Sequence, residues 1–146
     1  PDRWAGTASA LLAVNHPVLT GLVITALARL SKNSNFGATL ASSPGVLPAV
    51  LLTAGNDAED AKVRIAALHV AAASSTIQAG RDGVAAVPGA VDILARCLDV
   101  AAEGEDIAWP EGGRSAVTAL ANLAPQGIGM ILRSDIALPA LVRLLQ

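Results

Sequence analysis

The sequence predicts an all-α fold in which short helical units repeat and stack on one another. Hydrophobic residues make up 53% of the 146 residues, whereas aromatic residues make up only 2%. The apolar residues are mostly alanine, leucine and valine, which favours closely packed helices over β-sheets. Similar stretches also recur about every 45 residues, as expected for units that bury their apolar faces against one another.

The repeat is visible as three stretches that align at separations of 44 and 47 residues. They are GVLPAVLL (residues 45–52), GAVDILAR (89–96) and IALPALVR (136–143). A second motif precedes them as ALARLS (26–31), a degraded AALHVA (66–71) and ALANLA (119–124). The units therefore span roughly 1–43, 44–87 and 88–135, with a partial unit at 136–146.

Turn residues and apolar periodicity place the helices within each unit. Pro44-Gly45 and Pro88-Gly89 break the chain before a helix, and Gly55-Asn56-Asp57 closes one helix and can cap the next. Asp57, Glu59 and Asp60 resemble charges at a helix N-terminus rather than a catalytic acid–base pair. The predicted helices lie near 5–14, 18–32, 35–41, 46–54, 59–74, 77–86, 90–101, 113–124, 127–133 and 137–145.

The last segment carries an apolar stripe that needs a neighbour. Leu138, Leu141, Val142 and Leu145 are spaced at i, i+3, i+4 and i+7, so they share one face of a helix. In the earlier units the matching stretch is followed by a longer covering helix. We therefore expect a chain cut from a longer array, with further repeats at both ends and a frayed or partner-covered helix at 137–145.

These motifs resemble a known family. GVLPAVLL and IALPALVRLL look like the start of the second helix of an armadillo repeat, and TALANLA looks like the core of its third helix. The resemblance covers nearly the whole chain, and HEAT repeats are the nearest alternative. It implies one domain over residues 1–146, folded as a right-handed α-α superhelix of about three repeats plus partial ends. It also implies an intracellular, cytoplasmic protein-interaction scaffold.

The resemblance also points to a binding surface. In armadillo solenoids the third helices line a concave face, where an asparagine pairs with the backbone of an extended peptide; Asn122 is similar to that residue. Arg114, Thr118 and Asn122 lie at i, i+4 and i+8 and form one polar stripe. The matching residues of the other units are Thr25 and Arg29 in the first, and Lys62 and His69 in the second.

The stripe departs from the family pattern, because Arg29 and His69 stand where the asparagine would recur. The tryptophan that nuclear import adaptors use beside that asparagine is also absent. Both departures argue against a receptor for nuclear-localisation signals. Two interpretations of the stripe stay open, a solvated helix face and a partner-binding groove.

The stretch Asp99–Glu111 is predicted to be a loop and holds five of the twelve acidic residues. It reads either as a solvated loop or as an insertion that presents Trp109 to a partner, since an exposed tryptophan is a good anchor. Trp109 could equally fold back over the helix ends.

Composition and motifs offer no catalytic, metal or cofactor site. A net charge of −2 gives no general reason to bind nucleic acid. The uncharged stretches 4–28 and 33–56 are interrupted by turn residues, so we expect no membrane insertion. A single cysteine excludes an internal disulfide, and the apolar position of Cys97 indicates a small core residue. His69 is interpreted as a structural or surface residue rather than a catalytic one. The glycines near residues 80 and 127 lack the pattern of a phosphate-binding loop.

The sequence therefore predicts a non-catalytic scaffold that binds a protein partner, such as an extended peptide segment, along one face of stacked helices. The alternative is a structural segment of a large cytoskeletal, ciliary or chaperone-associated assembly, with both faces covered.

Overall fold

The computed structural model describes residues 3–43, 45–103 and 109–146, and gives side chains there except for those of residues 99–103, 109 and 110. Over these ranges the chain is all-helical, as predicted, and contains no β-strand. The helices are α1 (Arg3–Ala13), α2 (Pro17–Leu30), α3 (Phe36–Ala41), α4 (Val46–Ala54), α5 (Ala61–Ser74), α6 (Gln78–Ala85), α7 (Ala90–Glu103), α8 (Trp109–Arg133) and α9 (Ala137–Leu144).

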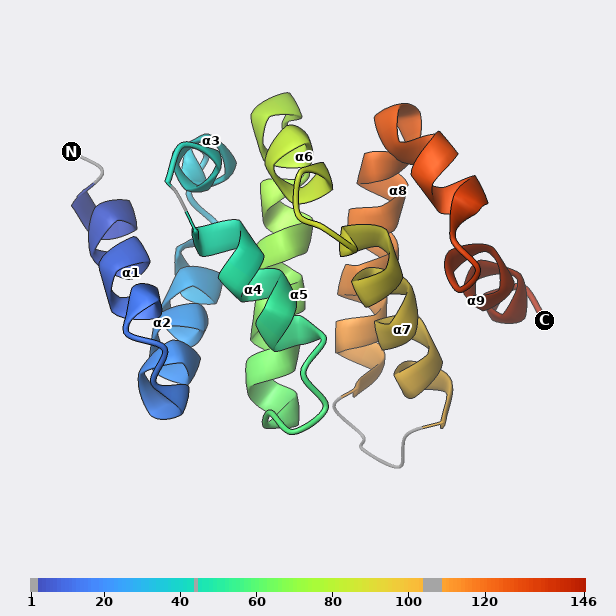
Figure 1. Ribbon diagram of the computed structural model, residues 1–146, viewed down its shortest axis with the longest axis horizontal. Helices are drawn as coiled ribbons and strands as arrows, with labels where there is room; N and C mark the ends of the chain where they lie inside the picture. Colours follow the sequence, from blue (N-terminus) through green and yellow to red (C-terminus); the bar gives the residue numbers. More distant parts are fainter. Residues whose placement is uncertain (1–2, 44, 104–108) are drawn as a thin grey trace.

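The helices form a row that runs from α1 at one end to α9 at the other (Figure 1). Helices with the same place in successive units lie against one another: α2 contacts α5, and α5 contacts α8. In the same way α1 contacts α4, α4 contacts α7, and α7 contacts α9. The short helices α3 and α6 also meet each other. The fold thus repeats one packing pattern along its length, with the two series of helices forming two layers.

The core lies between these two layers and is made mainly of aliphatic side chains. Helix α5 is buried on nearly all sides, because α2 and α8 flank it and α4 lies across it. Phe36 is buried at one end of the row and stacks on Trp4, with ring centroids 5.7 Å apart. The largest fully buried side chains are Phe36, Ile24, Leu27, Leu40, Leu51, Leu68, Leu94, Leu98, Leu120, Leu123, Val46 and Val50.

The turn residues explain where α4 and α7 begin. Gly45 and Gly89 adopt φ values of 78° and 73°, in the left-handed region that favours glycine. Gly55 closes α4, as predicted, and its N–H donates to the Leu51 carbonyl. The residue that caps α5 is Asp60, whose carboxylate accepts the Lys62 N–H at 2.8 Å. Capping by the Gly55-Asn56-Asp57 turn itself was therefore a wrong prediction.

The predicted helices at 113–124 and 127–133 are one helix in the structure. Helix α8 is continuous from Trp109 to Arg133 and contains Pro125. Proline inside a helix removes one backbone donor and clashes with the carbonyl four residues earlier, so it kinks or breaks the helix. Ala121, which holds that carbonyl, is exposed. Helix α8 changes direction in its C-terminal part, where it turns toward α9 (Figure 1).

The predicted loop Asp99–Glu111 is shorter than expected. Helix α7 continues to Glu103 and α8 begins at Trp109, so helical residues occupy both ends of that stretch. Residues 104–108 and the Trp109 side chain lie outside the described residues, and the idea that Trp109 contacts a partner stays a prediction.

Helix α8 also contains a segment, Glu111–Arg133, that is long and apolar enough to cross a membrane by length and composition. Core helices of water-soluble proteins share that composition, and α8 packs against both α5 and α7. The absence of membrane insertion remains an expectation.

Helix α9 is regular and leaves most of its predicted stripe exposed. Its buried residues are Ala137 and Ala140, and Leu141 is half-buried. Leu138 and Val142 are exposed, and Leu145, just beyond the helix, is 89% exposed. The predicted stripe is thus only partly covered within the described chain, because Leu141 packs against the core whereas Leu138, Val142 and Leu145 are exposed.

Candidate partner-binding surface

Helix α2 presents a mixed apolar and polar face to solvent. Val18 and Leu22 are 67% and 65% exposed, and Thr25 and Arg29 continue the same face toward the end of the helix. The Thr25 hydroxyl donates to the Gly21 carbonyl at 2.7 Å, so it presents mainly acceptor capacity to a ligand. Sequence analysis found Thr25 and Arg29 but missed Val18 and Leu22, because apolar residues at helical spacing read as core.

Helix α5 contributes Lys62 and His69, which have different surroundings. Lys62 is exposed in the first turn. His69 lies between two side chains of α8: its Nδ1 is 3.1 Å from Ser115 Oγ, and its Nε2 is 3.0 Å from Glu111 Oε1. His69 therefore ties α5 to α8 and is only partly available to a partner.

Helix α8 contributes Arg114 and Thr118, which are exposed, and Asn122, which is half-buried. The Asn122 amide donates to Ser75 Oγ at 3.2 Å, across the contact with α5. In the armadillo-like interpretation this asparagine would bind the backbone of a peptide. In the structure the amide nitrogen already donates one hydrogen bond that joins two units.

The seven stripe residues thus fall into two groups. The structure leaves Thr25, Arg29, Lys62, Arg114 and Thr118 exposed. It places His69 and Asn122 in a polar seam between the second and third units, which also includes Gln78, Asp82 and Gln126. His69 and Asn122, matched by sequence, bond to different partners and do not meet.

The seam contains a hydroxyl, an imidazole and a carboxylate in hydrogen-bonded order, the three groups of a serine-hydrolase triad. They belong to Ser115, His69 and Glu111. Ser115 is buried between the helices, however, so its hydroxyl is not presented to a substrate. The arrangement serves better as a structural tie, and it joins residues more than 40 positions apart that no local motif connects.

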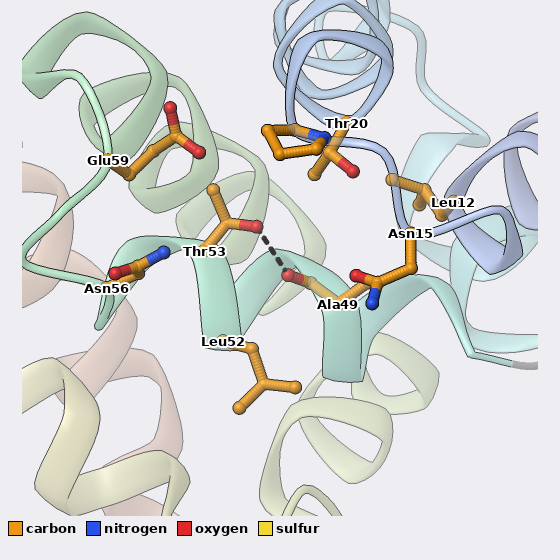
Figure 2. Close-up of a pocket in the computed structure, with 9 residues that line it drawn as sticks. Leu12, Asn15, Thr20, Ala49, Leu52, Thr53, Asn56 and Glu59 are labelled. Carbon is orange, nitrogen blue, oxygen red and sulfur yellow. Dashed lines mark hydrogen bonds between the residues drawn. The ribbon is translucent and has the colours of Figure 1, made fainter.

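Two adjoining clefts lie beside the exposed face of α2, and Glu59 lines both. The first has a volume of about 230 Å³ and is lined by Leu12, Asn15, Pro17, Thr20, Ala49, Leu52, Thr53, Asn56 and Glu59. The second, on the side of the exposed apolar residues, is lined by Pro17, Val18, Gly21, Leu22, Thr25, Glu59 and Val63. Figure 2 shows the first cleft with Glu59 and Asn15 on opposite sides and Thr53 of α4 between them. Sequence analysis treated Glu59 only as a helix N-terminal charge.

Cys97 is fully buried on α7, as expected for a small core residue. Its Sγ lies 3.5 Å from the Ala54 carbonyl oxygen. Burial raises the pKa of the Cys97 thiol above its ordinary value, and the neighbouring Arg64 opposes that rise. A buried, protonated thiol is a poor nucleophile. No group of three or more His, Cys, Asp or Glu residues in the described ranges is arranged to hold a metal ion.

The role of Asn122 can be tested by its effect on stability. We expect Asn122→Ala to lower the free energy of unfolding by about 1 kcal/mol, because it removes the hydrogen bond to Ser75 across the seam. Thr118→Ala is the matched control on the same helix. Its hydroxyl is exposed and donates within α8 to the Arg114 carbonyl, so its loss should change stability by less than about 0.5 kcal/mol. Urea denaturation of the two variants measures the difference, and equal values would show that the seam does not depend on Asn122.

Comparison with known proteins gives no relative for this chain: no protein-family model, no curated protein and no solved structure matches it.

Proposed function

We propose that this chain is part of an armadillo- or HEAT-like α-solenoid that acts as a non-catalytic scaffold and binds a segment of a partner protein. The right-handed superhelix and the repeat family are part of this proposal. The recurring contacts of α2 with α5 and of α5 with α8 support it, because stacked repeats meet mainly their neighbours.

The exposed face of α2 is the observation that carries the binding function. It places two large exposed aliphatic side chains, Val18 and Leu22, beside a cleft, and Arg29 follows about two turns farther along the same helix. Protein interfaces combine such apolar contacts with polar groups that fix orientation. Arg114 and Thr118 of α8 are also exposed, and we assign them to the polar part of the same binding surface in the third unit.

Reversing charge on this surface tests the proposal. We expect the double variant Arg29→Glu with Arg114→Glu to weaken partner binding at least tenfold, because both guanidinium groups are exposed there. The partner is first captured by affinity purification with cross-linking, which also maps the contacted face. Binding of the purified partner is then measured by titration.

The matched control is Arg3→Glu with Arg96→Glu, which changes the net charge equally on the exposed sides of α1 and α7. Equal weakening by both double variants would indicate a general charge effect. Unchanged affinity for the first double variant, with cross-links confined to α1, α4 and α7, would contradict the proposed face. Circular dichroism checks that each variant remains folded.

The second candidate function, a structural segment of a large assembly, has its own supporting observation. Leu138, Val142 and Leu145 at α9, together with Ile128 and Leu132 of α8, leave large apolar side chains exposed near one end of the row. Light scattering coupled to size-exclusion chromatography separates the candidates. Concentration-dependent aggregation that Val142→Ser with Leu145→Ser relieves would favour the assembly segment, whereas a stable monomer would favour the scaffold.

A further inference from the structure

We infer that the cleft around Glu59 receives a lysine or arginine side chain of the bound segment, and that the segment lies along α2 with its basic end at Glu59. This inference rests on the proposed function and adds the chemistry and direction of the partner. The cleft is built by the α1–α2 turn, by α4 and by the residue before Asp60, the cap of α5 (Figure 2).

The size of the cleft suits one side chain. Its volume of about 230 Å³ is below the roughly 300–1,000 Å³ of pockets that enclose a small-molecule ligand. Leu12, Ala49 and Leu52 supply apolar surface along which the aliphatic part of a long basic side chain can lie.

The polar groups of the cleft favour a cation over an anion. Glu59 is the one ionisable side chain among the residues that line the two clefts. The Thr53 hydroxyl donates to the Ala49 carbonyl at 2.9 Å, so toward the cleft it offers lone pairs (Figure 2). A carboxylate and a hydroxyl oxygen together match the N–H donors of an ammonium or guanidinium group.

The three acidic residues between α4 and α5 make different contacts. Asp57 pairs with Arg64 at 3.4 Å, and the Asp60 carboxylate caps α5. The Glu59 Oε1 accepts the backbone N–H of Asp60, but Glu59 has no ion-pair partner among the residues that the structure describes. Glu59 is therefore the acid that is left to pair with a ligand.

The residues beyond the Glu59 cleft indicate which side chains the rest of the bound partner segment carries. Val18, Leu22 and Val63 line the second cleft and would take an apolar side chain next to the basic one. Arg29 follows on the same helix, twelve residues after Pro17, or about 18 Å along the axis. An extended peptide covers that distance in about six residues. The segment therefore reads basic, then apolar, then acidic from Glu59 toward Arg29.

Peptide titration tests this inference. The probe is acetyl-Arg-Leu-Ser-Leu-Ser-Glu-amide, added at up to millimolar concentration to the isotopically labelled full chain and followed by changes in amide NMR signals. We expect saturable changes at Thr20, Asn56 and Glu59. Replacing the arginine of the probe by citrulline, which is neutral and of similar shape, should weaken binding about five- to tenfold.

Variants locate the contact. Glu59→Gln keeps an acceptor for the Asp60 N–H and should abolish the preference for arginine over citrulline. Asp135→Asn removes one exposed negative charge elsewhere and should leave the preference intact. The inference is overturned if the two probes bind equally to the unaltered chain, if neither probe shifts the Glu59 amide, or if Glu59→Gln retains the preference. If any of these results is found while Arg29→Glu with Arg114→Glu still weakens partner binding, the inference about Glu59 fails but the proposed function does not.

Discussion

Replacing Gly80 with alanine should lower the free energy of unfolding by about 3 kcal/mol, more than a typical surface substitution costs. A Cβ at this position in α6 would lie 1.5 Å from the carbonyl oxygen of Ser74, the last residue of α5. Ser74 is fully buried, and its carbonyl belongs to the backbone, so it cannot move aside as a flexible side chain would. Helix α6 must shift away from α5 instead. Urea denaturation at equilibrium measures the loss.

Gly6→Ala in α1 is the control for this prediction. A Cβ on Gly6 meets nothing within 4 Å, so only the helix preference of alanine applies, and stability should rise by about 0.5–1 kcal/mol. Opposite signs for the two variants are the expected result. A Gly80→Ala protein as stable as the unaltered chain would show that α6 does not pack closely on the end of α5.

The close approach of Gly80 to the Ser74 carbonyl is a feature that the sequence did not predict. The local pattern placed α6 near 77–86, and the structure has it at Gln78–Ala85. The local pattern gave no reason for residue 80 to be glycine, because the neighbour of Gly80 is the Ser74 carbonyl, which only tertiary packing brings close. Gly37 of α3 approaches the same oxygen, with its Cβ position at 3.0 Å. By contrast Gly45 and Gly89 were predictable, since a glycine after a proline and before a helix marks a turn.

The helix positions themselves followed from the sequence because apolar spacing and turn residues are local signals. The break at Pro125 was predicted wrongly for a physical reason. Proline reduces helix formation locally, but packing of α8 against α5 and α7 holds the helix on both sides of it.

The candidate surface was predictable only in part. Polar residues at i and i+4 identified Thr25, Arg29, Arg114 and Thr118 as exposed. Val18 and Leu22 have the spacing of buried residues, and they form a surface only because no helix of the described ranges covers them. Glu59 became a candidate only when the fold brought α4 and the α1–α2 turn to it.

Replacing Arg64 with methionine should lower the free energy of unfolding by about 1.5–3 kcal/mol, the range for a hydrogen bond that involves a charged group. The side chain of Arg64 is 9% exposed, and its Nε donates to the Ala54 carbonyl at 3.0 Å. That carbonyl is at the last residue of α4, where helix carbonyls lack partners within the helix. Methionine keeps the apolar stem but removes the donor, which leaves the Cys97 thiol at 3.5 Å as a weak one.

The effect should come from this capping bond rather than from the ion pair with Asp57. Asp57 is 89% exposed and lies 3.4 Å from Arg64, so water screens most of the attraction. Asp57→Asn should therefore change stability by less than about 1 kcal/mol, as exposed pairs do. Thermal and urea denaturation of both variants separate the two contributions. If Asp57→Asn costs as much as Arg64→Met, the ion pair holds α5 to α4 and the capping role is wrong. If only Arg64→Met is costly, the buried Arg64 holds α5 to the end of α4, the preceding helix of the same unit. The Cys97 thiol of the third unit lies beside that contact.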